Sequence, residues 1–215
     1  LEKQQRSEEI ARKEAEADVP QYILDHGNKG TWYDRPEIGK GYSPDYNDPF
    51  LLENLKKFIA AFGKHYSSME SLAVLQYGIF GHWGEWHTWP DGSGELPGKA
   101  TEVDIIWAIN EAFPRNFLQA RYHNSWTAKD PRVGFHDDCW GELTSCTDGR
   151  WCTQYNLDLL NLNDRWKTAP NGGEFCSPKH FLQGSDAEFQ KALAEITTYH
   201  ASWLGPQAVG DLEPG

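Results

Sequence analysis

The sequence predicts an α/β fold in which parallel strands alternate with helices. Apolar runs too short for typical helices are predicted to be strands, and they lie at 72–81, 117–122, 133–136, 169–175 and 200–204. Segments with apolar residues at helical spacing lie between these strands, at 101–113, 154–166 and 186–199. Such alternation implies parallel strands with right-handed crossovers. A doubly wound sheet and a (β/α)-barrel both satisfy it.

The chain before the first strand divides into three predicted parts. Residues 1–18 are rich in Glu, Lys, Arg and Ala, which predicts a charged arm, helical or disordered. The main domain then covers 19–215. Glycines and prolines recur through 19–48, which predicts a loop. Asp48 can cap the helix that follows, and Pro49 suits its first turn.

The strand predictions differ in strength. The run at 72–81 is nearly all apolar, as expected for a strand buried on both faces of a parallel sheet. The run at 169–175 contains Pro170 and two glycines, and these residues weaken the prediction of a strand there. The sequence contains no glycine-rich phosphate loop, and this counts against a nucleotide-binding version of the fold.

Composition narrows the class of partner. The formal net charge of −12 argues against nucleic acid, whose phosphates attract Lys and Arg, and against an anionic membrane surface. No apolar run is long enough to cross a bilayer. Ten tryptophans are more than packing requires, and aromatic side chains commonly line ligand pockets. An oligosaccharide or polysaccharide is the expected partner, and no cofactor is expected.

The four cysteines predict disulfide bonds. Cys139, Cys146, Cys152 and Cys176 form an even, clustered set, which favours two bridges and a secreted or extracellular location. A zinc site is the alternative, but the paired C-x-x-C spacing that such sites favour is missing. Cys139 and Cys176 follow adjacent predicted strands, so we expect them to pair and leave Cys146 and Cys152 to close a small loop.

Polar and aromatic side chains gather directly after the predicted strands. In a (β/α)-barrel the carboxyl ends of all strands face one side, and that side holds the active site. Indole rings there can stack on sugar rings, so four of the tryptophans are expected at the mouth of one cleft, at least two with an exposed ring face. The candidate sugar-binding residues are His82, Trp83, Trp86, His87, Trp89, Arg121, His123, Asn124, His136, Asp137 and Trp140.

Glu85 and Glu174 are the candidate catalytic pair. Glycoside cleavage needs one carboxyl group to protonate the leaving oxygen and another to attack the sugar or activate water. Glu85 lies between tryptophans, whose desolvation is expected to raise its pKa, and Glu174 is expected near Arg121 and ionised. Asp137 and Asp138 are the rival acids. Adjacent strand residues point to opposite faces, so at most one of them faces the site.

The candidate metal ligands among the histidines are His82, His87 and His136. Neither an H-x-x-x-H nor an H-E-x-x-H pair is present, so hydrogen bonding to sugar is the preferred interpretation and no metal is expected.

Several motifs resemble a family of glycoside-hydrolase-like (β/α)8-barrel domains of unknown function. They lie at 41–49, 81–90, 172–174 and 200–204. The resemblance implies a TIM-type barrel that is incomplete at its N-terminus, with strands from about the third or fourth to the eighth present and the earlier strands before Leu1. It also implies that Glu85 ends the fourth strand as acid/base and that Glu174 ends the seventh as nucleophile.

Two functions remain open at this point. The first is a glycoside hydrolase with a two-carboxylate retaining mechanism. The second is a non-catalytic carbohydrate-binding or extracellular structural protein that keeps the cleft without turnover, since a fold alone does not decide activity.

Overall fold

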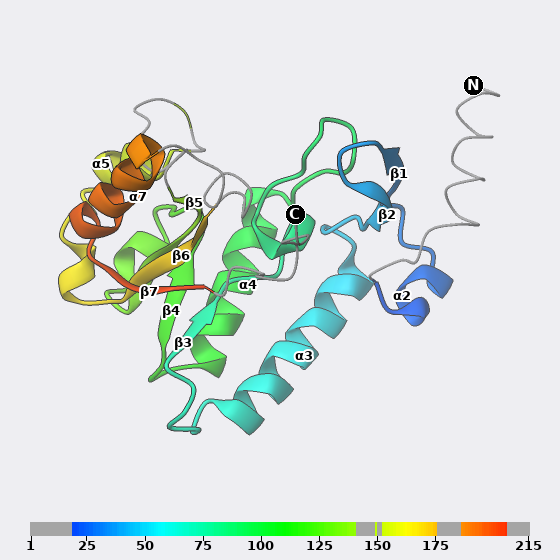
Figure 1. Cartoon of the computed structure of the whole chain (residues 1–215). Helices are drawn as coiled ribbons and strands as arrows, with labels where there is room; N and C mark the ends of the chain where they lie inside the picture. Colours follow the sequence, from blue (N-terminus) through cyan, green and yellow to red (C-terminus); the bar gives the residue numbers. More distant parts are fainter. Residues whose placement is uncertain (1–18, 141–148, 150–151, 176–185, 206–215) are drawn as a thin grey trace. The chain divides into compact units, whose positions relative to one another are not determined.

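The computed structural model describes residues 19–140, 149, 152–175 and 186–205 (Figure 1). The chain forms two compact units. The first unit comprises Leu1–Met69 and Gly78–Pro114, and the second comprises Glu70–Tyr77 and Arg115–Gly215. The predicted arm at 1–18 lies outside the described residues. No helix in the described part is long and apolar enough to cross a membrane.

A curled five-stranded parallel sheet forms the second unit (Figure 1). Its strands follow one another in chain order, so the α/β prediction with parallel strands is confirmed. Among the described strands, the first and the last form the two edges. The strands are β3 (Val74–Gln76), β4 (Phe117–Ala120), β5 (Val133–Trp140), β6 (Asn171–Phe175) and β7 (Ala201–Leu204).

Strand β3 is shorter than the predicted run at 72–81. The chain keeps one further sheet contact at Tyr77, whose N–H donates to the carbonyl of Gln119 at 2.9 Å. Gly78 then opens a segment of the first unit. The apolar residues at 79 and 80 therefore pack in that unit rather than extend the strand.

Helices cover one face of the second unit's sheet. They are α5 (Thr153–Leu159), with the short η3 (Arg165–Lys167), and α7 (Asp186–Thr198), while η2 (Thr127–Lys129) follows β4. The core of this face consists of Phe135, Trp140, Leu157, Leu162 and Tyr199. Helix α5 ends well before the predicted residue 166 because Asn161 takes a left-handed backbone conformation with φ of 54°.

Trp140 is a core residue, which corrects the prediction that it lines a sugar cleft. Only 2% of it is exposed, and its ring lies 5.9 Å from those of Phe135 and Tyr199. Phe135 and Trp140 are five residues apart and would face opposite sides of a regular strand. The register of β5 against β6 shifts between Asp137 and Trp140, and this bulge turns both rings to one side.

The first unit combines a hairpin with two longer helices. Its elements are α2 (Gln21–Asp25), β1 (Thr31–Arg35), β2 (Gly39–Ser43), α3 (Pro49–Tyr66), η1 (His82–Gly84) and α4 (Lys99–Ala112). Helices α3 and α4 pack closely where Gly63, buried and without a side chain, contacts Ala112. The rings of Phe62 and Phe113 lie 5.5 Å apart beside this contact.

The antiparallel pair β1–β2 corrects the prediction that 19–48 is a loop. The glycines that suggested a loop serve the hairpin itself. Gly39 has φ of 78° at the turn, which a glycine adopts readily. Gly41 lies opposite Tyr33, and its missing side chain leaves room for the Tyr33 ring.

The predicted cap of α3 is confirmed and yields a test. The Asp48 carboxylate accepts the backbone N–H of Leu51 at 2.8 Å, and Pro49 occupies the first turn. Asp48→Ala should therefore lower the free energy of unfolding by about 1 kcal/mol. Urea titration followed by circular dichroism measures this, with Glu53→Ala on the exposed face as control. Equal effects of the two substitutions would contradict the capping role.

Candidate functional site

The carboxyl edge of the second unit's sheet carries a buried ion cluster. Arg121 follows β4, and its guanidinium pairs with the carboxylate of Asp138 from β5. The carboxylate of Asp137 lies 3.9 Å from the same guanidinium. The side chains of Arg121 and Asp138 are 4% and 9% exposed. Burial alone would lower the pKa of Arg121, but the two carboxylates raise it, so the guanidinium stays charged.

Asp137 and Asp138 both reach Arg121, which corrects the prediction that only one of them faces the cluster. The bulge that starts at Asp137 breaks the regular alternation of side chains. Asp137 is fully buried and accepts hydrogen bonds from the hydroxyl of Thr153 at 2.7 Å and the backbone N–H of Cys139 at 2.8 Å. These contacts give Asp137 a structural role in place of the predicted sugar contact.

Glu174 lies on β6 and has an environment opposite to the predicted one. Burial raises the pKa of its carboxyl group, and the negative charge of Asp138 raises it further. The sequence placed Glu174 beside Arg121 as an ionised group. That expectation is wrong because Arg121 is paired with the two aspartates. Both effects favour the protonated form of the Glu174 carboxyl group.

His136 lies between the ion cluster and an aromatic ring. Burial lowers its pKa, so the imidazole is neutral at physiological pH. Its ring stacks on Trp203 of β7 at 5.9 Å with an interplanar angle of 30°. Trp203 can lie this close to the sheet because Gly172 has no side chain in its path. Trp203 was not a predicted site residue, although the motif at 200–204 contains it.

His123 and Asn124 hold the turn after β4, although Nε2 of the buried His123 has no hydrogen-bond partner in the described residues. His123 is buried, and burial followed by the charge of Arg165 lowers its pKa to about 3. It contacts the hydroxyl of Thr127 at 3.2 Å. The Asn124 side chain accepts the backbone N–H groups of Trp126 and Thr127 at 2.8 and 3.1 Å. Both residues therefore serve local structure.

The tryptophan-rich loop of the first unit carries Glu85. The loop closes on itself through hydrogen bonds from the N–H of His82 to the carbonyl of His87 at 2.8 Å, and from Trp86 to Phe80 at 2.8 Å. The Glu85 carboxylate lies 3.0 Å from Nε2 of His87, and its side chain is 20% exposed. Glu85 is thus held at the surface of its loop by a neighbouring imidazole.

The loop tryptophans separate into exposed and buried rings. Trp83 is 66% exposed and Trp89 is 51% exposed, whereas Trp86 packs on Phe80 and is 9% exposed. Trp83 and Trp86 have positive φ of 53° and 60°. Such backbone strain costs on the order of 1–3 kcal/mol per residue and tends to occur at functional sites.

His82 anchors this loop from within. Its Nδ1 lies 2.8 Å from the carbonyl of Trp89, and its Nε2 lies 3.3 Å from the hydroxyl of Ser43 and 3.4 Å from the carbonyl of Ser93. The side chain is buried. The predicted sugar contact by His82 therefore competes with a structural role that already uses both ring nitrogens.

The candidate acids belong to different units, Glu85 to the first and Glu174 to the second. Of the four cysteines, Cys139 and Cys152 lie in the described part, and neither is a free thiol. The predicted pairing also involves Cys146 and Cys176, which lie outside the described residues, so it stays a prediction.

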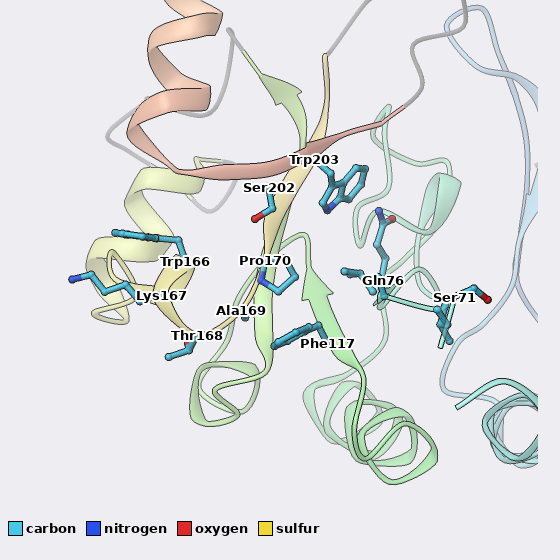
Figure 2. Close-up of a pocket in the computed structure, with 13 residues that line it drawn as sticks. Ser71, Gln76, Phe117, Trp166, Lys167, Thr168, Ala169, Pro170, Ser202 and Trp203 are labelled. Carbon is cyan, nitrogen blue, oxygen red and sulfur yellow. The ribbon is translucent and has the colours of Figure 1, made fainter. Parts of the chain in front are cut away.

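A pocket of about 830 Å³ lies elsewhere in the second unit, near the amino ends of β4 and β6 (Figure 2). It extends between the edge strands β3 and β7 and is mainly apolar, with Phe117, Pro170 and Trp203 in its lining. None of the described residues that line it is an aspartate or glutamate. The pocket therefore lies apart from the acids at the carboxyl edge, and no pattern in the sequence indicates it.

Comparison with protein-family models and with curated proteins finds no match to this chain.

The environment of Glu174 predicts a pH-dependent cost to stability. Its pKa is raised in the folded state above the ordinary value of 4.5, so folding favours the protonated form. The contribution of Glu174 to the free energy of unfolding is most favourable when the pH is below that ordinary pKa. It is lost as the pH rises through the folded-state pKa. Glu174→Gln should therefore unfold at a higher temperature than the wild type at pH 7, and the difference should shrink toward pH 4.

Thermal unfolding across this pH range measures the effect, with Glu102→Gln on α4 as control. A Glu174→Gln protein that is less stable than the wild type at pH 7 would show that the ionised carboxylate is favoured in the fold.

Proposed function

We propose that this protein hydrolyses glycosidic bonds, with Glu174 and Glu85 as its two carboxyl groups. The observation that carries the proposal is the state of Glu174, a half-buried acid at the carboxyl edge of a parallel sheet whose pKa is raised by burial and by Asp138. Active sites of (β/α)-barrels occupy this edge, and a glycosidase acid must retain its proton near neutral pH.

The two environments favour roles that reverse the sequence-based assignment. Glu174 is the proton donor to the leaving oxygen. Glu85 is then the nucleophile, and its hydrogen-bonding distance to Nε2 of His87 suits an ionised carboxylate. In a retaining mechanism Glu85 forms a bond to the anomeric carbon as the leaving group departs with the proton of Glu174, and water activated by Glu174 then breaks that bond.

The exposed rings support a sugar substrate. Trp83 and Trp89 present large apolar surfaces to solvent in the same loop as Glu85. Large exposed aromatic rings near polar groups are typical of ligand sites. Stacking on these rings would hold a glycan chain while the carboxyl groups act.

We also propose that further parallel strands complete this sheet to a (β/α)8 barrel by pairing with β3 and β7. In the described part these are the edge strands, and the apolar pocket of Figure 2 lies between them. Nε1 of Trp203, which lines this pocket, is buried without a hydrogen-bond partner in the described residues, and so is Oε1 of Gln119 on β4. Side chains of added strands would fill this space and satisfy such groups.

The two catalytic roles can be separated by the leaving group of the substrate. Glu174→Gln should lose activity on natural glycans by about 10²-fold or more, because the leaving oxygen no longer receives a proton. It should keep much of the first step on a dinitrophenyl glycoside, whose leaving group needs no acid. Glu85→Gln should be inactive on both substrates. Release of dinitrophenol and of reducing ends measures these rates in the full chain.

Azide provides the control for role assignment. Added azide should restore turnover of the dinitrophenyl glycoside by Glu174→Gln, since the anion replaces activated water in the second step. Glu102→Gln should behave as wild type. Wild-type protein that binds glycans but cleaves neither substrate would replace the hydrolase proposal with the non-catalytic carbohydrate-binding function.

A further inference from the structure

A second pocket, of about 440 Å³, lies entirely within the first unit. The hairpin β1–β2, the first turns of α3 and the segment 79–84 enclose it, and 19–20 close one side. This volume falls in the range of about 300–1,000 Å³ that small-molecule sites occupy. Its aromatic lining consists of Tyr33, Tyr42, Tyr46, His82 and Trp83.

The rings of this pocket are held in place before any ligand binds. The hydroxyl of Tyr46 accepts the N–H of Gly81 at 3.0 Å, and the hydroxyl of Tyr42 accepts the N–H of Gly30 at 2.7 Å. The His82 ring lies 5.2 Å from that of Tyr33. Because backbone groups fix these side chains, a ligand would meet a rigid surface and little conformational entropy would be lost on binding.

The charged residues that line the pocket indicate which class of ligand it can bind. Among the described residues that line the pocket, Lys40 is the one lysine or arginine, and none is an aspartate or glutamate. These residues offer a cationic ligand no counter-charge. Apolar ring faces together with a few polar groups, among them Lys40 and Ser43, suit a molecule with an apolar face and hydroxyl groups at its edge.

Trp83 forms part of the pocket while most of its surface meets solvent. Its backbone is left-handed, with φ of 53° and ψ of 11°, a conformation that is unfavourable for a bulky residue. Hydrogen bonds from Gly84 to Gly81 and from Glu85 to His82 hold the turn in this form. The indole contacts the rings of His82 and His87, each at 5.7 Å, but most of it stays exposed, as is typical of a ring that meets a ligand.

We propose that this pocket binds one sugar residue of a glycan, with a C–H face of the sugar stacked on Trp83 and its hydroxyls directed toward Lys40. The choice of a sugar rests on the proposed function. The site itself is independent of Glu174, because all of its residues belong to the first unit. It would give the protein a glycan-holding subsite in addition to its acids.

The experiment compares glycan binding by full-length wild type, Glu174→Gln and Trp83→Asn. Asparagine tolerates the left-handed conformation, so Trp83→Asn should fold and melt no lower than the wild type. It should bind the best ligand from an array of neutral and acidic glycans about tenfold more weakly or worse, whereas Glu174→Gln should bind as the wild type does. Lys40→Met should also weaken binding, and Trp107→Ala, which removes an exposed indole on α4, should not.

A second readout identifies the pocket directly. The indole N–H resonance that disappears in Trp83→Asn should be among those that shift when the glycan is added to the wild type. Unchanged affinity in Trp83→Asn with hydrolysis intact would overturn the pocket and leave the proposed function standing. Trp83-dependent binding without hydrolysis would support the pocket and overturn the proposed function. The absence of both binding and hydrolysis would overturn the pocket and the proposed function together.

Discussion

The buried contact between Arg121 and Asp138 is the interaction on which the chemistry of the second unit depends. It joins the ends of β4 and β5 in a place that solvent hardly reaches. Removing one partner of such a pair typically costs about 3–5 kcal/mol, because the other charge is left buried. Burial raises the pKa of Glu174, and the negative charge of Asp138, which is itself paired with Arg121, raises it further.

Much of the second unit follows from simple patterns in the sequence. Each predicted strand has a counterpart in β3 to β7. Short apolar runs that alternate with helical segments are a strong signal for parallel strands, whichever apolar residues they contain. The hairpin at 31–43 is not predicted by the sequence, because its strands lack a clear apolar pattern. Its strands contain charged residues and glycines, and it is held by contacts such as that between Tyr33 and Gly41, which no local pattern reveals.

The presence of polar residues at the carboxyl ends of the strands was predictable from the sequence, but their environments were not. Polar residues do follow the strands, as expected for a carboxyl edge. One bulge in β5 nevertheless directs Trp140 into the core and brings Asp137 and Asp138 to the same guanidinium. A register shift of this kind depends on pairing with β6, so alternation along β5 alone could not show it.

The most direct test of this account is the pKa of Glu174 itself. Carbon-detected NMR titration of glutamate carboxyl groups in the full-length protein, with Glu174→Gln for assignment, gives this value. The account predicts a pKa above the ordinary value of 4.5, and it predicts that Asp138→Asn shifts the value downward while leaving other glutamates unchanged. A Glu174 pKa at or below the ordinary value would contradict the proton-donor role and the proposal built on it.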